Sequence, residues 1–277
     1  MNGIGYKIKK TILYILLILL SVVCMFPFLL MIVNATRSGS EIMKSFTLIP
    51  SVYLKENWAT VFKYFNLFLG MWNSLKVAVP STLLCAYFSA MTAYALAMYK
   101  FKGNKVLFMT ILIFMMIPGQ LGLIGFYNLC TKLHLVNSYI PLIIPCIAAP
   151  AVVFFMKQYM ESTLSIEMIE AARIDGAREF RIFNTIIMPI MKPAVATQAI
   201  FQFIAQWNNL FTPTIMLTTD EKKTLPLFVQ MLTSDQFRVD YGVVYVGLTV
   251  TVLPLIIAYL ILSKYIVAGV ALGGVKG

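Results

Sequence analysis

The sequence predicts an all-α, polytopic membrane protein with six transmembrane helices. Three observations lead to this fold class. Hydrophobic residues make up 60% of the 277-residue chain and charged residues only 12%. The mean hydropathy is +0.84, which lies far above the values of soluble globular domains. The apolar runs also approach the roughly 20 residues that cross a bilayer as a helix, and the charges gather between these runs.

The whole chain is interpreted as one transmembrane domain, residues 1–277. The predicted spans cover about residues 12–33, 73–98, 106–127, 139–157, 185–208 and 243–262. Lys7, Lys9 and Lys10 precede the first span, as the basic residues of a signal peptide would. However, the apolar run that follows is too long for a signal peptide, and no small-residue cleavage site comes after it. We therefore expect a retained membrane anchor.

The distribution of Lys and Arg predicts the orientation of the spans, because cytoplasmic loops are enriched in these residues. One side would carry twelve of them, namely Lys7, Lys9, Lys10, Lys100, Lys102, Lys105, Lys157, Arg173, Arg178, Arg181, Lys264 and Lys276. The loops of the other side, 34–72, 128–138 and 209–242, are longer in total but carry only eight. Both termini and the loop 158–184 are thus predicted to be cytoplasmic, with 34–72 and 209–242 as external loops.

Several classes of function lack the residues that they need. The four cysteines form no C-x-x-C pair, His134 stands alone, and no hydrolase or metalloprotease motif is present, so we predict no catalytic residue and no metal site. The net charge of +11 suits anionic lipid headgroups. No basic run alternates with aromatic residues as in a nucleic-acid-binding surface, so we expect no nucleic-acid partner.

The source of energy for transport is also constrained. All eleven Asp and Glu residues lie outside the predicted spans, whereas ion-coupled carriers usually need an ionisable group at membrane depth. This argues against a stand-alone secondary carrier, although uniporters and carriers that bind ions through backbone groups remain open. The chain also lacks a phosphate-binding G-x-x-x-x-G-K-[ST] loop. If the protein performs active transport, a partner chain must supply the energy.

The stretch EAARIDGAREFRIFNTIIMPIMKPAVAT, from Glu170 to Thr197, interrupts the apolar pattern with charges. When 166–183 is treated as a helix, one side carries small and apolar residues, namely Ile169, Ala172, Gly176, Phe180 and Phe183. The other side carries charges of both signs, namely Glu167, Glu170, Asp175, Arg178 and Arg181. Mixed charges beside small residues favour docking in a protein groove over binding to anionic lipid, which would call for a uniformly basic face.

The backbone of this segment has two interpretations. Asp175-Gly176 is a turn signal. A helix that ends near Gly176, followed by a second one that starts at Ala177, is therefore as consistent with the sequence as one continuous helix. Further along, Pro189 and Pro193 predict a kink where the chain enters the fifth span.

The order of motifs along the chain resembles a known family. Glu170-Ala171-Ala172, Gly176, and Ile187-Met188-Pro189 match the "EAA" motif of ABC-importer permeases. The chain is most similar to the second permease subunit of maltose-type carbohydrate importers, in which "NSLKVAV", "HLVNSYIPLII", "QWNNLFTPTIML", "KKTLPLF" and the final "GGVKG" follow in this order. The family often has a proline where this chain has Ser165, and a serine there can cap the following helix instead.

The resemblance implies a set of partners. A homologous second permease would share the translocation pathway, and two copies of a cytoplasmic ATPase would bind below the pair. An external solute-binding protein would deliver the sugar, with the 209–242 loop as its docking surface. The ATP and its Mg²⁺ would be bound by the ATPase, so no cofactor is expected on this chain. The localisation implied is the bacterial cytoplasmic membrane.

The resemblance also assigns residues. Element 166–183 would couple to the ATPase through Glu170, Ala171, Ala172, Asp175, Gly176 and Phe180. The C-terminal tail would contact the ATPases through Gly273, Gly274, Val275 and Lys276. Polar and aromatic residues suited to a sugar pathway are Gln120, Tyr127, Gln202, Gln206, Trp207, Asn208 and Asn209. A polar residue in a helix bundle can instead form hydrogen bonds that hold neighbouring helices together. A permease for a non-sugar solute remains an alternative.

Overall fold

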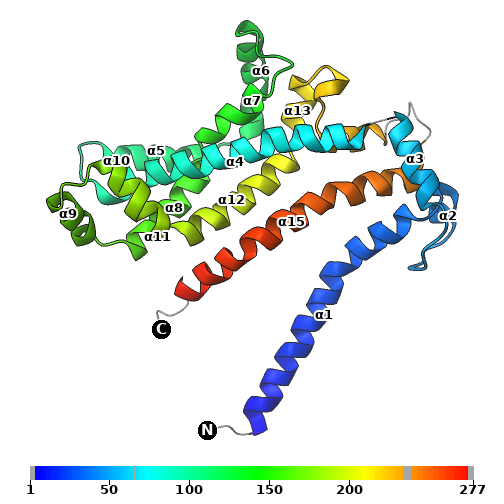
Figure 1. Ribbon diagram of the computed structural model, residues 1–277, viewed down its shortest axis with the longest axis horizontal. Helices are drawn as coiled ribbons and strands as arrows, with labels where there is room; N and C mark the ends of the chain where they lie inside the picture. Colours follow the sequence, from blue (N-terminus) through cyan, green and yellow to red (C-terminus); the bar gives the residue numbers. More distant parts are fainter. Residues whose placement is uncertain (1–3, 65, 234–238, 274–277) are drawn as a thin grey trace. The chain divides into compact units, whose positions relative to one another are not determined.

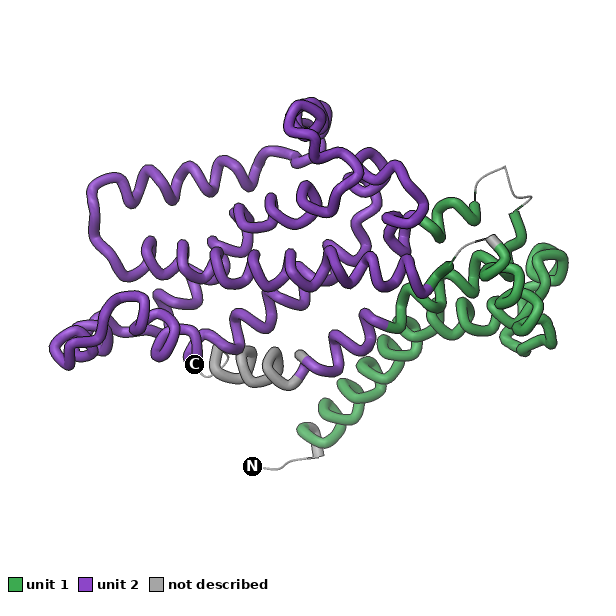
Figure 2. The backbone as a smooth tube through the Cα atoms, turned by 45° about the horizontal axis from the view of Figure 1, so that its top comes forward, with its two compact units in different colours: residues 1–67, 228–253 green, residues 68–227, 254–277 purple. Residues whose placement is uncertain are grey.

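The computed structural model describes residues 4–64, 66–233 and 239–273, and all regular structure in these ranges is helical (Figure 1). The chain forms two compact units (Figure 2). Unit 1 comprises residues 1–67 and 228–253, and unit 2 comprises residues 68–227 and 254–277. Both units lie within the region predicted above to be one transmembrane domain.

The helices divide between the units as follows. Unit 1 contains α1 (Ile4–Ala35), α2 (Gly39–Lys44) and α3 (Leu54–Tyr64). Unit 2 contains α4 (Leu67–Met98, apart from its first residue), α5 (Asn104–Met116), α6 (Leu123–Lys132), α7 (Ile140–Ile143), α8 (Pro150–Thr163), α9 (Ile166–Ile174), α10 (Glu179–Ile182), α11 (Met188–Ile190), α12 (Lys192–Trp207) and α13 (Phe211–Met216). Helices α14 (Leu225–Met231) and α15 (Tyr241–Gly273) have residues in both units.

Four helical segments are long and apolar enough to cross a membrane, and they correspond to predicted spans 1, 2, 4 and 6. These segments are Tyr6–Ala35, Leu67–Met98, Ile140–Thr163 and Tyr241–Ile261. Two bent helix pairs meet the same length and composition criteria, so the described residues provide up to six spans. The all-helical membrane fold is therefore confirmed, while the number six stays a prediction.

The predicted third span, 106–127, is not one continuous helix. Helix α5 ends at Met116, and the pair Asn104–Met116 and Gly119–Lys132 is bent by 89°. The cause is Pro118, which has no amide hydrogen and disfavours helical geometry in the residue before it. Ile117 is accordingly extended, with φ −83° and ψ 121°. The signal for this break, Pro118-Gly119, was present in the sequence.

The kink expected at the fifth span lies between the two prolines that predicted it. The segments Glu179–Ile190 and Lys192–Trp207 are bent by 80° around Met191. Pro189 lies in the short helix before the bend, and Pro193 lies in the first turn of α12. The missing amide of Pro193 costs little there, because the first amides of a helix have no intrahelical partner.

Helix α4 forms the centre of unit 2 (Figure 1). Half of its most apolar 18-residue window is buried, and its buried side includes Ala86, Ala90 and Ala93. These small side chains allow neighbouring helices to approach closely. The same core takes in Met156 and Met160 of α8, as well as residues of α9 to α12. The segment that precedes the fifth span is thereby anchored to the end of α4.

Unit 1 is held together by a buried polar junction at the end of α1. The Asn57 side chain donates hydrogen bonds to the backbone oxygens of Ala35 and Arg37, at 2.9 and 2.8 Å. The Arg37 guanidinium donates to Asn34 Oδ1 and to the backbone oxygens of Glu41 and Ser45. Gly242, at the start of α15, packs so tightly here that a Cβ on it would lie 2.3 Å from Arg37 O.

Candidate functional site

The EAA segment forms two short helices joined by a turn. Helix α9 begins after Ser165, whose hydroxyl accepts a hydrogen bond from the Met168 amide, so the expected serine cap is present. Helix α9 ends at Ile174, and α10 begins at Glu179. Of the two sequence interpretations, the interrupted helix is correct, but its second part starts two residues after the expected Ala177.

Gly176 terminates α9 in a Schellman motif. Its φ is +78°, a left-handed conformation that glycine adopts without steric cost. The Ala177 amide donates to Ala172 O, and the Gly176 amide donates to Arg173 O, each at 3.0 Å. These two bonds satisfy carbonyl groups that the helix end would otherwise leave unpaired. Asp175 is the C-cap residue of α9 and does not cap the second helix.

An ionic cluster braces the two helices across this turn. Arg173 Nε donates to Glu179 Oε1 at 2.6 Å, and the other carboxylate oxygen accepts from the hydroxyls of Tyr99 and Tyr94. The Arg173 guanidinium also lies over the Tyr99 ring, 5.3 Å from its centroid. Because Tyr94 lies on α4 and Tyr99 directly follows it, the cluster ties the EAA segment to the end of α4.

The charges in this cluster stabilise one another. The hydrogen bond from Arg173 is the largest influence on Glu179, and it holds the pKa of this carboxyl below its ordinary value of 4.5. Partial burial acts in the opposite direction, and the hydrogen bond from Tyr99 lowers the pKa further. The same pairing with Glu179 raises the pKa of Arg173. Glu179 is therefore a carboxylate and a hydrogen-bond acceptor at neutral pH.

The inner face of the segment is only partly the one that the helical pattern predicted. Ile169, Ala172 and Phe183 are buried, as expected for a face that packs on unit 2. Phe180 was placed on the same face, but its side chain is 68% exposed, and Ile182 is buried instead. The reason is the turn at Gly176. It resets the rotation of the second helix, so a single 100° periodicity does not extend across it.

The outer face exposes apolar side chains beside unpaired charges. Ile174 is 87% exposed and Phe180 is 68% exposed, so this element presents two large apolar side chains outside the predicted spans. Glu170 and Ala171 are exposed on the same element. Within the described ranges, Glu170 forms no ion pair. We define the outer face as Glu170, Ala171, Ile174 and Phe180. Sequence reasoning missed Ile174, whose isolated position in the charged stretch was the available signal.

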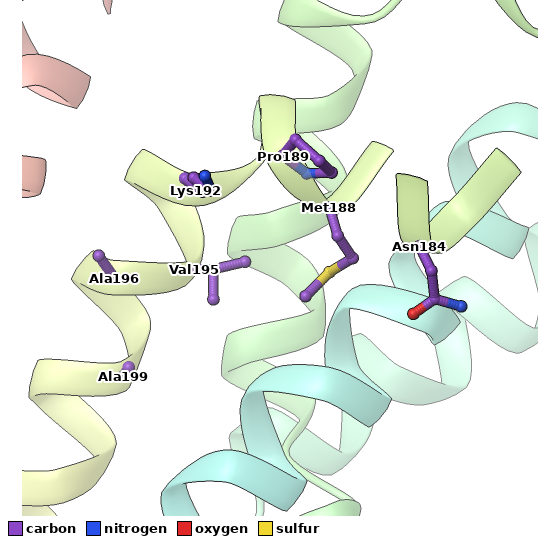
Figure 3. A pocket seen from close by; sticks show the side chains of 7 residues that line it. All are labelled: Asn184, Met188, Pro189, Lys192, Val195, Ala196 and Ala199. Carbon is purple, nitrogen blue, oxygen red and sulfur yellow. The ribbon is translucent and has the colours of Figure 1, made fainter. Parts of the chain in front are cut away.

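A hollow of about 420 Å³ lies behind the segment, at the bend before α12. Figure 3 shows Met188 and Val195 within it, with Asn184 on one side and Lys192 on the other. Asn184 is held in place from two directions, since it accepts from the Tyr87 hydroxyl at 3.3 Å and donates to Phe180 O at 2.8 Å. The hollow lies next to the kinked backbone and is lined mainly by apolar side chains.

The predicted pathway residues do not form one cluster. Gln120 is exposed in the 3-10 turn between α5 and α6, and Tyr127 is half-buried on α6. The remaining ones lie on or just after α12, namely Gln202, Gln206, Trp207, Asn208 and Asn209. Trp207 is fully buried and stacks on Phe203, with ring centroids 5.7 Å apart. Gln206 Oε1 is buried without a hydrogen-bond partner among the described residues.

The tail residues can be placed only in part. Gly273 is the last residue of α15. Gly274, Val275 and Lys276 lie outside the described residues. In the described ranges, no group of three or more His, Cys, Asp or Glu side chains comes together as a metal site would require.

A family model for the inner membrane component of binding-protein-dependent transport systems matches residues 82–272, which include the whole EAA segment and its bend. The chain belongs to this family. The resemblance noted from the EAA motif is thereby confirmed. In this permease, the family match begins within α4 and ends one residue before the end of α15.

Named relatives match the permease along nearly its whole length. It is 36% identical over 259 residues to an arabinooligosaccharides transport system permease protein of Halalkalibacterium halodurans, with 92% of each chain covered. It is 31% identical to a trehalose/maltose transport system permease protein of Thermococcus litoralis, with 98% of each covered. A lactose transport system permease protein of Rhizobium radiobacter is 28% identical, and both chains are covered completely.

A solved structure has the same fold. The permease aligns with a TM-score of 0.78 and 22% identity to a chain in the crystal structure of a bacterial ABC transporter involved in the import of the acidic polysaccharide alginate. The alignment covers 96% of the permease and 99% of that chain. At this level of identity the likeness concerns the fold, and it agrees with the helical membrane architecture described above.

Proposed function

We propose that this permease forms, with a homologous second permease, the path by which a sugar or oligosaccharide enters the cell. Support for a carbohydrate comes from the relatives, whose names specify arabinooligosaccharides, trehalose and maltose, and lactose. An external solute-binding protein delivers the sugar, and the loop 209–242 is its docking surface. Both termini and the EAA segment face the cytoplasm, as the Lys and Arg distribution favours.

The energy comes from an ATPase that docks on the outer face, and the ATP and Mg²⁺ are bound by that partner. The observation that carries this part of the proposal is the exposure of Ile174 and Phe180 on an element whose inner face is firmly packed. Apolar side chains exposed beside the unpaired Glu170 carboxylate fit a partner groove that offers apolar contacts and a basic group. Glu170 then forms a charge-assisted hydrogen bond there.

The mechanism requires that the docking element move as one body. Arg173, Glu179 and Tyr99 connect α9, α10 and the end of α4, so a displacement of the outer face is passed to α4. Because α4 forms the centre of unit 2, the displacement can alter the helix packing that opens or closes the pathway. This chain performs no chemical step in the cycle.

The direct test is crosslinking. A cysteine at Ala171, which is exposed on the outer face, is expected to crosslink to the co-expressed ATPase. The exposed native Cys24 is first replaced by serine, whereas Cys85, Cys130 and Cys146 are buried. A cysteine at Ser162, exposed near the end of α8, is the matched control and should react much less. Equal reaction at both positions, or sugar uptake by this chain alone, contradicts the proposal.

A permease for a non-sugar solute is the second candidate, since the EAA element does not depend on the solute. Measuring which solute the companion binding protein retains distinguishes the two candidates.

A further inference from the structure

A basic hollow lies where the chain turns from α4 into α5. Its volume is about 690 Å³, and its lining includes Lys100, Lys102 and Lys105. All three lysines are exposed, and within the described part of the chain none of them pairs with a carboxylate. Three ammonium groups around one hollow create a strongly positive site, and the docking function proposed above does not use it.

The backbone around the hollow is ordered by hydrogen bonds. The Asn104 side chain donates to Leu96 O at 3.0 Å and to Tyr99 O at 2.9 Å, which folds the loop back on the end of α4. Gly103, with φ +95°, is the N-cap of α5 and has no side chain to cap it. The N-terminus of α5 therefore adds its partial positive charge to that of the lysines.

The surface next to the hollow is apolar. Val106, which lines it, is 68% exposed, and Leu107 and Met109 are 51% and 57% exposed. Further along α5, Ile113 and Phe114 are also more than half exposed. A basic site that continues directly into an exposed apolar helix matches a molecule with an anionic head and a hydrocarbon tail. A free anion would use only the basic part of this surface, whereas a phospholipid would use both the basic part and the apolar part.

We propose that Lys100, Lys102 and Lys105 bind the phosphate of an anionic glycerophospholipid, whose acyl chains lie along the exposed side of α5. By the predicted orientation, this lipid belongs to the cytoplasmic leaflet. The site borders Tyr99 of the Arg173–Glu179 brace, but the three lysines take no part in the proposed docking contacts or in the choice of solute.

The test counts the lipids that the purified full-length chain retains. The chain is equilibrated in detergent with dioleoylphosphatidylglycerol or dioleoylphosphatidylcholine, and retained lipids are counted by native mass spectrometry. The change of Lys100, Lys102 and Lys105 to Gln should lower phosphatidylglycerol retention by roughly tenfold or more, because each lysine near a lipid headgroup contributes independently. The charge-preserving change of the same residues to Arg should keep retention near that of the wild type.

The control removes the same charge elsewhere. Lys7, Lys9 and Lys10 are likewise exposed and adjoin a span on the same predicted side, so their change to Gln should leave retention within about twofold of the wild type if attraction is local to the hollow. Equal loss in both triple variants means a general electrostatic effect and overturns the proposal. Displacement of the lipid by millimolar inorganic phosphate alone also overturns it. So does a Lys100/Lys102/Lys105 variant that keeps its lipid but loses a co-purified ATPase.

Discussion

Arg173 Nε, in the last turn of α9, lies 2.6 Å from Oε1 of Glu179, the first residue of α10. This contact spans the Schellman turn and closes the two helices into one element. Its partners Tyr94 and Tyr99 come from a different part of the chain. The pair thus connects a local helix end to the central helix of unit 2.

Removing the charge of Glu179 should uncouple the docking element from α4. In Glu179→Gln, the ion pair is lost while the size of the side chain is kept, so we expect ATP-driven uptake to fall several-fold with little change in the amount of protein in the membrane. Uptake by membrane vesicles measures this effect. Glu167→Gln is the control, because Glu167 is exposed on α9 without an ion pair among the described residues. Equal losses in both variants would contradict a specific role for Glu179.

The lowered pKa of Glu179 predicts how the brace responds to acid. A carboxyl whose pKa is lower in the folded state stabilises that state above its unfolded pKa, and the stabilisation disappears as the pH falls through the folded pKa. The brace should therefore persist from neutral pH down to the ordinary carboxyl value of 4.5 and weaken only below it. Amide hydrogen exchange across 166–183, corrected for intrinsic rates, would show this. Loosening that begins well above pH 4.5 would contradict the assignment.

Substituting Gly176 should strain the turn without creating a clash. A Cβ at this position meets no atom within 4 Å, but φ +78° disfavours any side chain. We expect Gly176→Ala to cost about 1–2 kcal/mol of local stability, the typical price of a left-handed residue. Gly125→Ala is the matched control, because Gly125 also has open space and lies in α6 without a positive φ. The control should be neutral or slightly stabilising in thermal unfolding.

The exposed apolar residues of the outer face should be needed for docking but not for folding. Ile174→Ser and Phe180→Ser leave the buried core unchanged, because both side chains are mostly exposed. We expect the amount of ATPase that co-purifies to fall roughly tenfold or more, as truncation of central interface residues usually does. Met43→Ser, at a 76% exposed position in the predicted external loop, should have no effect. Normal co-purification of both variants would place docking elsewhere.

A side chain at Gly242 should destabilise the polar junction in unit 1. A Cβ there would lie 2.3 Å from Arg37 O and 2.6 Å from Asn57 Nδ2, so backbone would have to move. We expect Gly242→Ala to destabilise the protein by about 1–3 kcal/mol, as overpacking does. At Gly39 the nearest atom is the side-chain oxygen of Asp240, at 2.9 Å, which can rotate away. Gly39→Ala should therefore be milder in thermal unfolding.

Features encoded by neighbouring residues were predictable from the sequence. The serine cap at Ser165, the helix end at Gly176 and the kink between Pro189 and Pro193 all depend on backbone preferences that act over a few residues. The break at Pro118 belongs to the same class and was missed only because the apolar run of 106–127 was read as continuous. Where a proline or glycine signal for a helix break falls inside an apolar run, the break decides where the helix ends.

Features that depend on distant residues were not predictable in this way. Glu179 belongs to the charged stretch from Glu170 to Thr197, but its partners Tyr94 and Tyr99 are 85 and 80 residues away in the chain. Phe180 was assigned to the wrong face because the turn before it changes the helical phase. Ile174, by contrast, precedes that turn, and the 100° period places it on the opposite side of α9 from the buried Ile169. Its exposure therefore follows the ordinary helical pattern, whereas the position of Phe180 does not.

The alanines that let α4 pack closely also affect how the protein enters the membrane. The most apolar window of α4 has a mean hydropathy of 1.3, compared with 3.0 for α1. Helix α1 is hydrophobic enough to partition into lipid unaided, whereas small and hydroxyl side chains make α4 a weak insertion signal. We expect α4 to remain close to the insertion machinery until α8 and α12 have been synthesised to cover it. Biogenesis would then depend on the order of synthesis, with the centre of unit 2 settling into the bilayer only after its neighbours.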